Sequence, residues 1–359
     1  MLKILDIYII KKFLGTFFYA IALIIGIVII FDISEKIDDF IEREPPLRAI
    51  IFDYYMNFIP YFANLFMALF TFIAVIFFTS NMASNSEIIA ILSNGVSYKR
   101  LMLPYFISSL IIAILSYTLI NFIIPPANKV RLDFEENYYR QAFYNKDKNI
   151  HRQIDPGVFI YMESYNNFYD IGYKFSIEKF EDGKLKSKLV SNYIKWDTTI
   201  NKWKIHNYHI RHFDGINETI EQGRTIDTVI NIHPSDFSRR LSVVETMNYW
   251  ELNDFIDEQI KIGADNIEIY LIEKYKRFAF PFSTFILTLI GVTLSSRKTR
   301  GGVGINIGIG LLIAFTYIMF IQVSTVLSTH SNMDPLIAVW IPNILFAIIS
   351  IFLYKYATR

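Results

Sequence analysis

Six long runs without charged residues divide this chain, and each is long enough to cross a membrane as a helix. Crossing the hydrocarbon core of a bilayer takes about 20 apolar residues in a helix. The runs cover residues 13–31, 58–79, 101–125, 278–296, 303–324 and 335–354. Three of them precede a long polar segment and three follow it, so the pattern predicts an α-helical membrane protein with six spans arranged 3+3.

The long polar segment alternates in the way that β-strands do. Tyr173, Phe175 and Ile177 alternate with polar residues, which is the period-two pattern of a strand with one buried face. Asp-Gly pairs separate several such runs and are typical of turns. Strands at this spacing predict an inserted antiparallel β-jelly roll or sandwich, with a cavity or an ordinary core inside. The aromatic residues available for that interior are Phe159, Tyr161, Tyr173, Phe175 and Trp203.

These patterns divide the chain into four parts. Asn248 and Glu251 have the spacing of a helix cap, and apolar residues at helical intervals follow them, so a helix leads back to the membrane. The predicted domains are residues 1–125 with the first three spans, 126–246 with the β-jelly roll, 247–277 with the connecting helix, and 278–359 with the last three spans.

Basic residues are concentrated on one side of the predicted membrane. They are Lys3, Lys11, Lys12, Lys99, Arg100, Arg297, Lys298, Arg300, Lys355 and Arg359. The other side has an acidic segment at 32–53 and a loop at 325–334 without lysine or arginine. Because cytoplasmic loops carry the excess of positive charge, we expect both termini in the cytoplasm and the β-domain outside it.

A short polar break lies between the second and third runs, on the basic side. Ser84 and Glu87 have the spacing of a capping box, and Asn94 with Gly95 is a typical helix end. The sequence therefore predicts a helix over 84–96, which is too short to cross a bilayer. Its narrow apolar face consists of Ile88, Ile91 and Leu92. Two interpretations stay open: a coupling helix moved by a motor protein, or a loop helix packed on its own bundle.

Composition limits the chemistry of the chain. It is 53% hydrophobic and 16% aromatic with clustered apolar residues, which is typical of a membrane protein. A formal net charge of +1 without a basic tract predicts no nucleic-acid partner. Cysteine is absent, which excludes thiol catalysis, and the phosphate-binding GxxxxGK[ST] pattern does not occur. Strand alternation places His206 and His212 on one face and His209 on the other, so we predict no catalytic or metal site.

Four stretches of the chain, in order, carry a resemblance to one family. They are LDIY at 5–8, SEIIAILSNGVS at 86–97, NYYRQAFY at 137–144, and RFAFP at 277–281 with the glycine-rich exit that follows the fourth span. Together with the order of elements, they resemble the lipopolysaccharide-export permease family LptF/LptG (YjgP/YjgQ) over essentially the whole chain. The first and third stretches are more similar to LptG than to LptF.

This resemblance implies a permease subunit of an ATP-driven, ABC-type lipopolysaccharide exporter in the bacterial inner membrane. It implies a second, LptF-like permease, a dimeric LptB-like ATPase, and LptC/LptA-like jelly-roll proteins in the periplasm as partners. Lipopolysaccharide would leave the membrane between the two permeases and pass to the periplasmic jelly roll. The chain itself would be non-catalytic and hold no cofactor, since the ATPase binds ATP and Mg²⁺.

The resemblance also implies two sets of site residues. The residues expected to meet the ATPase are Glu87, Ile88, Ile91, Leu92, Gly95 and Val96. The family often carries lysine at the outer end of span one, where this chain is mainly acidic. The lipid-binding candidates are Lys36, Arg140, Arg277, Tyr317 and Phe320. Each has a plainer alternative, because basic residues snorkel at membrane interfaces and aromatic ones pack against lipid.

A second hypothesis comes from a different class of protein. The chain could be a mechanotransmitting membrane subunit that couples a cytoplasmic ATPase to an extracytoplasmic partner without lipid passage. Lipid crosslinked inside the β-domain would favour the exporter, whereas coupling that survives a filled β-domain cavity would favour mechanotransmission.

Overall fold

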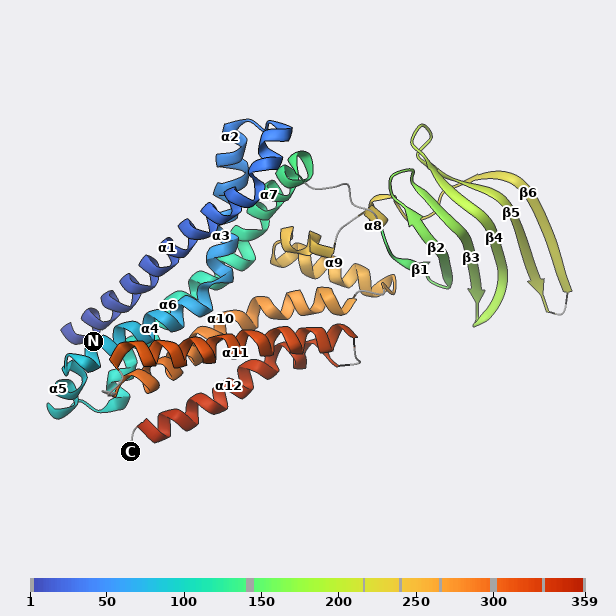
Figure 1. The fold of residues 1–359 in the computed structure, drawn as a ribbon. Coiled ribbons are helices and arrows are strands. Elements are labelled where there is room, and N and C mark those ends of the chain that lie inside the picture. Colours follow the sequence, from blue (N-terminus) through green and yellow to red (C-terminus); the bar gives the residue numbers. More distant parts are fainter. Residues whose placement is uncertain are drawn as a thin grey trace. The chain divides into compact units, whose positions relative to one another are not determined.

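The computed structural model describes residues 3–139, 145–215, 217–238, 241–264, 267–297, 302–330 and 333–357. They form two compact units, each built around its own core (Figure 1). A helical unit comprises Met1–Arg140, Glu245–Tyr249 and Glu268–Arg359. A β unit comprises Gln141–Val244 and Trp250–Ile267. The β unit is thus inserted in the chain between two blocks of membrane helices.

Within the described residues, six helical stretches of the helical unit are long and apolar enough to cross a membrane. Its elements before the insertion are α1 (Ile4–Arg43), α2 (Leu47–Ala49), η1 (Ile50–Tyr55), α3 (Met56–Leu65), α4 (Met67–Ser84), α5 (Glu87–Ser93), α6 (Tyr98–Thr118), η2 (Leu119–Ile123) and α7 (Ile124–Tyr138). Those after it are α10 (Ile267–Ser295), α11 (Gly302–His330) and α12 (Pro335–Ala357). α1 ends where Glu44 takes the left-handed conformation (φ 46°) ahead of Pro45.

α4 is the central helix of this unit and packs against both α1 and α11. One apolar cluster joins Ile9 and Phe13 of α1 to Val75 of α4 and to the start of α6. A second cluster joins Phe72 of α4 to α10, α11 and α12. Gly291 lets α10 approach closely, because a Cβ there would lie 2.8 Å from Cγ1 of Val75.

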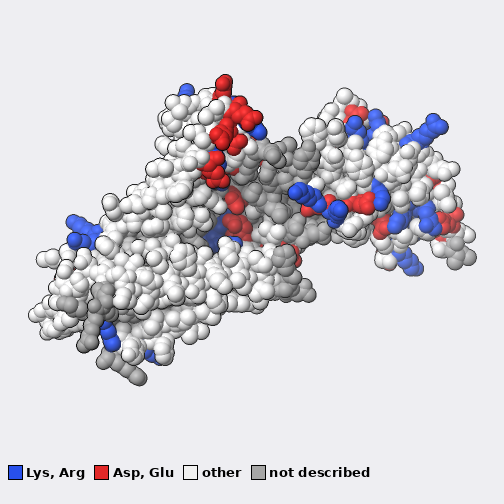
Figure 2. Space-filling view, in the orientation of Figure 1, with Lys and Arg blue, Asp and Glu red and all other residues white. Residues whose placement is uncertain are grey.

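Several helix ends meet at one end of the helical unit (Figure 1). They are the start of α1, all of α5, and the last turns of α10 and α12. Arg297, just after α10, donates to the carbonyl oxygen of Tyr356 on α12 at 3.1 Å and so links these two helix ends. Figure 2 shows blue side chains near this end, red ones around α2 at the other, and a largely uncharged surface between them. This distribution matches the predicted membrane-crossing runs.

The β unit is one antiparallel sheet in which each strand pairs with the next along the chain, in the order β1-β2-β3-β4-β5-β6. The strands are β1 (Lys148–Asp155), β2 (Val158–Asn166), β3 (Ile171–Glu181), β4 (Lys184–Asp197), β5 (Lys202–Asp214) and β6 (Asn217–Thr228). The short helices α8 (Ser235–Ser238) and η3 (Leu241–Thr246) follow, and then α9 (Tyr249–Lys261). This arrangement is jelly-roll-like, as the sequence predicts.

The core of the β unit lies on one face of the sheet. Phe175 and Trp203 are fully buried there, and Nε1 of Trp203 donates to the carbonyl oxygen of Ile232 at 2.9 Å. Tyr173 is 41% exposed, because Lys174 has a φ of 49° and interrupts the strand alternation between the two aromatic residues. The prediction that Tyr173 and Phe175 share a buried face is therefore wrong.

A similar interruption occurs in β5. Asn207 has a φ of 51°, and Ile205 and Tyr208, three residues apart, both pack on the core cluster. His206 and His209 consequently lie together on the opposite face, which corrects the partition expected from plain alternation. Burial and two neighbouring lysines lower the pKa of His206. Among the described residues, no three His, Cys, Asp or Glu side chains are grouped as metal ligands.

Candidate functional site

The predicted coupling segment forms a short helix, α5, between α4 and α6. α4 continues to Ser84, so the helix begins at Glu87 and ends at Ser93, inside the predicted range of 84–96. Ser86 precedes it in the left-handed conformation (φ 62°), and its side chain makes no capping hydrogen bond. Gly95 terminates the segment as the sequence predicts, since its φ of 84° favours glycine.

The apolar side chains of α5 do not all face outward. Ile88 is 1% exposed, and Ile91 and Leu92 pack partly buried against the same cluster of the helical unit. The face predicted to fill an ATPase groove thus lies mainly on the chain's own bundle. The surface that α5 presents is formed by Ile89, Ala90 and Ser93, with Asn94 and Gly95 after it. Contact of Ile88, Ile91 and Leu92 with an ATPase stays a prediction.

Ile89 is the residue of this segment that sequence reasoning missed. It is 52% exposed, next to a buried neighbour, at the start of the run IIAIL. The sequence does contain a signal for it, because Ile89 is an apolar residue outside the predicted apolar face of Ile88, Ile91 and Leu92. Glu87 is half-buried and accepts a hydrogen bond from the hydroxyl of Tyr8 at 3.2 Å, while Val96 is half-buried in the loop before α6.

A pocket of about 570 Å³ lies inside the helical unit. α3, η2, α7, α10, α11 and α12 contribute to its walls, and Phe66 and Leu69 also line it. Phe280, Phe315 and Ile318 make part of the wall apolar. Because Phe315 is 61% exposed, the pocket reaches the surface of the unit beside α11. This combination of apolar walls and a few polar groups is typical of a small-molecule or lipid site.

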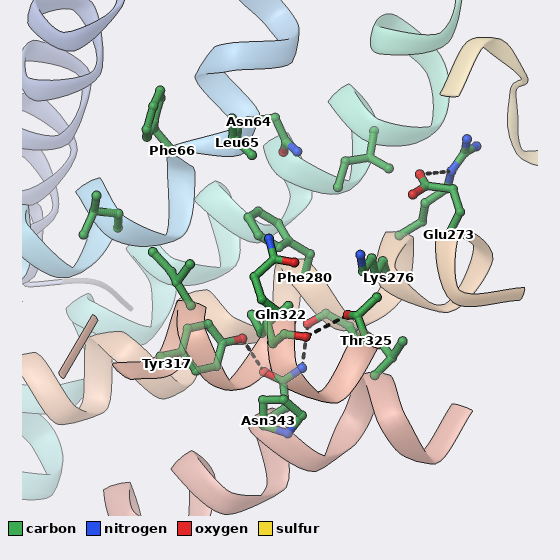
Figure 3. A pocket seen from close by; sticks show the side chains of 18 of the residues that line it. Asn64, Leu65, Phe66, Glu273, Lys276, Phe280, Tyr317, Gln322, Thr325 and Asn343 are labelled. Atoms are coloured by element: carbon green, nitrogen blue, oxygen red, sulfur yellow. Dashed lines mark hydrogen bonds and ion pairs between the residues drawn. The ribbon is translucent and has the colours of Figure 1, made fainter. Parts of the chain in front are cut away.

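One end of the pocket is polar but internally satisfied (Figure 3). The hydroxyl of Tyr317 donates to Oδ1 of Asn343 at 2.7 Å, and Nδ2 of Asn343 donates to the carbonyl oxygen of Ala279 at 2.9 Å. On another part of the pocket wall, beside Leu65 and Phe66 in Figure 3, Oδ1 of Asn64 accepts a hydrogen bond from Ser116 at 2.8 Å. The side-chain oxygens of Asn64 and Asn343 are therefore already hydrogen-bonded within the chain.

The opposite end of the pocket is charged (Figure 3). Glu245, Glu273, Lys276 and Arg277 line it. The Arg277 side chain is 2% exposed, and it pairs with Glu273 (Nε to Oε1, 3.5 Å) and donates to the carbonyl oxygen of Met247 at 2.9 Å. Lys276, one residue earlier on α10, is half-exposed, so this end has two acidic and two basic side chains.

The structure brings two of the predicted lipid-binding residues together and separates the others. Arg277 and Tyr317 line the same pocket. Phe320 is 39% exposed and contacts the ring of Phe346, with 6.2 Å between centroids. Arg140 lies outside the described residues. Lipid contact by these residues stays a prediction. Because Arg277 is paired with Glu273, a lipid phosphate would have to compete with the Glu273 carboxylate for the guanidinium of Arg277.

Lys36 occupies a different place, near the C-terminal end of α1. It pairs with Asp32 and with the hydroxyl of Tyr54, and both charged side chains are largely buried. Its ammonium also lies 4.7 Å and 4.9 Å from the ring centroids of Tyr54 and Tyr139. The hydroxyl of Tyr55 donates to the other oxygen of Asp32 at 3.1 Å. This lysine is therefore neutralised within its own chain.

Taken together, the six apolar helical stretches in two blocks and the inserted jelly-roll-like sheet define a multi-pass membrane protein with a β unit between its two helical blocks in the chain. A family model described as lipopolysaccharide export system permease LptF/LptG matches residues 7–356. The chain belongs to that family and is a lipopolysaccharide export permease of the inner membrane. The comparison with curated proteins gives no match. The family model covers both LptF and LptG, so the greater similarity to LptG stays a prediction.

Proposed function

We propose that the chain is the membrane-spanning subunit of an ATP-driven exporter, moved by a cytoplasmic LptB-like ATPase and paired with an LptF-like permease. It extracts lipopolysaccharide from the inner membrane and passes it to its own β unit and then to LptC/LptA-like proteins. The chain provides no catalytic group, and ATP with Mg²⁺ binds to the ATPase. The observation that carries this proposal is the pocket that joins Arg277 at one end to Tyr317 at the other.

The uneven coverage of the helices supports a paired permease. α4 and α10 are mostly buried, with 67% and 61% of their most apolar 18-residue windows inside the unit. α1 and α11 flank α4, yet only 17% and 22% of their windows are buried. A second subunit seated against both would cover them, and the pocket edge at Phe315 would then face the space between the two permeases.

Photocrosslinking tests lipid passage directly. A photoreactive residue at Phe315, on the pocket wall, should capture lipopolysaccharide in inner-membrane vesicles when the ATPase is present, and the yield should change when ATP is added. Phe352 on α12 is the matched control, because it is an exposed phenylalanine (72%) outside the set of residues that line the pocket. Equal capture at both positions would mean ordinary lipid contact. ATPase coupling without any capture at Phe315 would favour the mechanotransmitting subunit.

The proposed orientation places α5 and both termini in the cytoplasm and the β unit in the periplasm. The basic residues near α5 and the positive-inside rule support it. Since the sequence contains no cysteine, single cysteines at Lys99 and Thr198 can be labelled cleanly. A membrane-impermeant maleimide should reach position 198 in intact spheroplasts and position 99 only after lysis. The reverse pattern would overturn the orientation.

A further inference from the structure

Two side-chain links join the first turns of α1 to the two ends of the α5 segment. NH1 and NH2 of Arg100 donate to Oδ1 and Oδ2 of Asp6 at 2.7 and 2.6 Å. The hydroxyl of Tyr8 donates to Oε2 of Glu87 at 3.2 Å. Glu87 is the first residue of α5, and Arg100 lies in the first turn of α6. The first turns of α1 are therefore linked both to the first residue of α5 and to the start of α6, the helix that follows it.

Asp6 is buried in this joint. Its side chain is 3% exposed, and its carboxylate also accepts a hydrogen bond from the backbone nitrogen of Lys3 at 2.6 Å, which closes the first turn of α1. Bidentate arginine–carboxylate pairs are the strong, directional class of hydrogen bond. Removing one partner of a buried pair leaves an uncompensated charge. The Asp6–Arg100 pair is thus a stiff connection.

Apolar packing fills the space between the two polar links. Ile88 of α5 belongs to the same buried cluster as Ile9 and Phe13 of α1, and Leu5 packs against that cluster. By contrast, α5 joins its neighbours in sequence through turns at 85–86 and 94–97. The hydrogen bond from Tyr8 and the shared apolar cluster therefore add side-chain contacts with α1 to these backbone connections.

We propose that Asp6 and Arg100 are positioning residues that make the start of α1 move as one body with the segment formed by α5 and the first turn of α6. This inference rests on the proposed function, in which an ATPase displaces α5. The displacement then reaches α1 directly, and α1 is the helix that leaves most of its surface uncovered beside the space for a second subunit. The two residues set how much lipid movement each ATP produces, without touching the lipid or the nucleotide.

Besides its packing on α4, which precedes it in the chain, the same segment has weaker side-chain contacts with α10 and α12. The hydroxyl of Tyr98 lies 3.1 Å from Oγ of Ser296 at the end of α10, and its ring lies 5.8 Å from that of Tyr354 on α12. These are one neutral hydrogen bond and one ring contact, whereas the link to α1 is a bidentate ion pair. α10 is also mostly buried, whereas α1 is mostly exposed on the unit. Moving α10 would therefore disturb more of the close packing between helices than moving α1.

The first experiment measures lipid transferred per ATP hydrolysed in reconstituted full complexes. Asp6→Asn and Arg100→Gln should keep ATPase association and lower this ratio by about tenfold, which is the scale on which coupling residues act. Arg297→Gln is the matched control, because it removes an arginine at the same end of the unit without contacting α1. An unchanged ratio in folded Asp6→Asn and Arg100→Gln complexes would overturn the proposal.

A second experiment does not depend on weakening the ion pair. Tyr8→Cys with Ser86→Cys, joined by a short bis-maleimide, fixes α1 to the start of α5. Ser86 is the exposed residue before Glu87 and lies outside the set expected to meet the ATPase, and the sequence contains no other cysteine to react. If the two move together, the linked complex should transfer lipid at close to the unlinked rate. Loss of transfer on linking, with retained ATP hydrolysis, would overturn the inference alone. A wild-type complex that moves no lipid would overturn the proposed function, and the inference with it.

Discussion

Tyr317 and Asn343 form a hydrogen bond that joins α11 to α12 at the floor of the pocket. The Tyr317 hydroxyl donates to Oδ1 of Asn343 at 2.7 Å, and both side chains are at least 96% buried, with exposures of 2% and 4%. Asn343 also donates to the carbonyl oxygen of Ala279 on α10. The Asn343 side-chain amide therefore connects three helices. Because the Tyr317 hydroxyl and the Asn343 amide bond to partners within the chain, their polar atoms at the pocket floor are already hydrogen-bonded.

Tyr317→Phe should destabilise the helical unit while leaving the pocket shape unchanged. Oδ1 of Asn343 would lose its buried donor, at a cost of about 1–2 kcal/mol. The measurement is thermal unfolding in detergent, where the midpoint should fall by roughly 2–4 °C. Lipid capture by a photoreactive residue at Phe315 should persist. Loss of capture at unchanged stability would instead make the Tyr317 hydroxyl a direct lipid contact.

Ile89→Asp should prevent the ATPase from co-purifying with the chain. The side chain is 52% exposed on the free surface of α5, so a carboxylate there should not disturb the fold but would oppose an apolar contact. Ile91→Asp is the informative comparison, because Ile91 packs against the helical unit and its replacement should also lower the unfolding temperature. Wild-type recovery of the ATPase with Ile89→Asp would remove this surface from the coupling interface.

The sequence was sufficient for the spans and for the existence of α5, but not for the side of α5 that faces outward. Long uncharged runs predict membrane-spanning helices, and the structure has helices there. Gly95 follows α5 in the left-handed conformation that glycine adopts readily, as the Asn-Gly pair predicts. The apolar face of a short helix, however, fits a partner and its own bundle equally well. Packing decided between them, since Ile88 contributes to a cluster with α1 and α6 residues that are distant in the sequence.

The β unit and the pocket show the same limit in other forms. Plain alternation fails at Lys174 and Asn207, where single left-handed residues shift the strand and no glycine marks the position. The pocket depends on helices that are up to 282 residues apart, from Tyr61 to Asn343. Family resemblance selected Arg277 and Tyr317 separately, and only the three-dimensional arrangement shows that they line one cavity.

Lys36→Gln should destabilise the C-terminal part of α1. Asp32 would lose its charged partner in a largely buried setting, and breaking one side of such a pair costs about 3 kcal/mol. The double variant Asp32→Asn/Lys36→Gln removes both charges and should recover most of the loss. Unfolding of both variants in denaturant measures the difference.

The same pair of variants separates the internal role of Lys36 from lipid binding. Lipid transfer by Asp32→Asn/Lys36→Gln should be close to wild type if Lys36 only neutralises Asp32. A stable double variant that loses lipid transfer would instead restore Lys36 as a phosphate ligand. Arg48→Gln serves as the control for a basic residue near the same end of the unit, outside the Asp32–Lys36 pair.

The stability of the β unit should fall as the pH drops from about 4 to about 2, partly through Asp197. The hydroxyl and backbone nitrogen of Thr199, and then Nζ of Lys204 at 3.1 Å, lower the pKa of Asp197 from 3.8 to about 2. A carboxyl whose pKa is lower in the folded state stabilises the fold above its unfolded pKa and loses that contribution as protons bind. Asp197→Asn should flatten this part of the profile, followed by the fluorescence of Trp196 and Trp203 in the full chain. Asp182→Asn, in another hairpin turn, provides the matched control, and an equal slope in both variants would contradict the assignment.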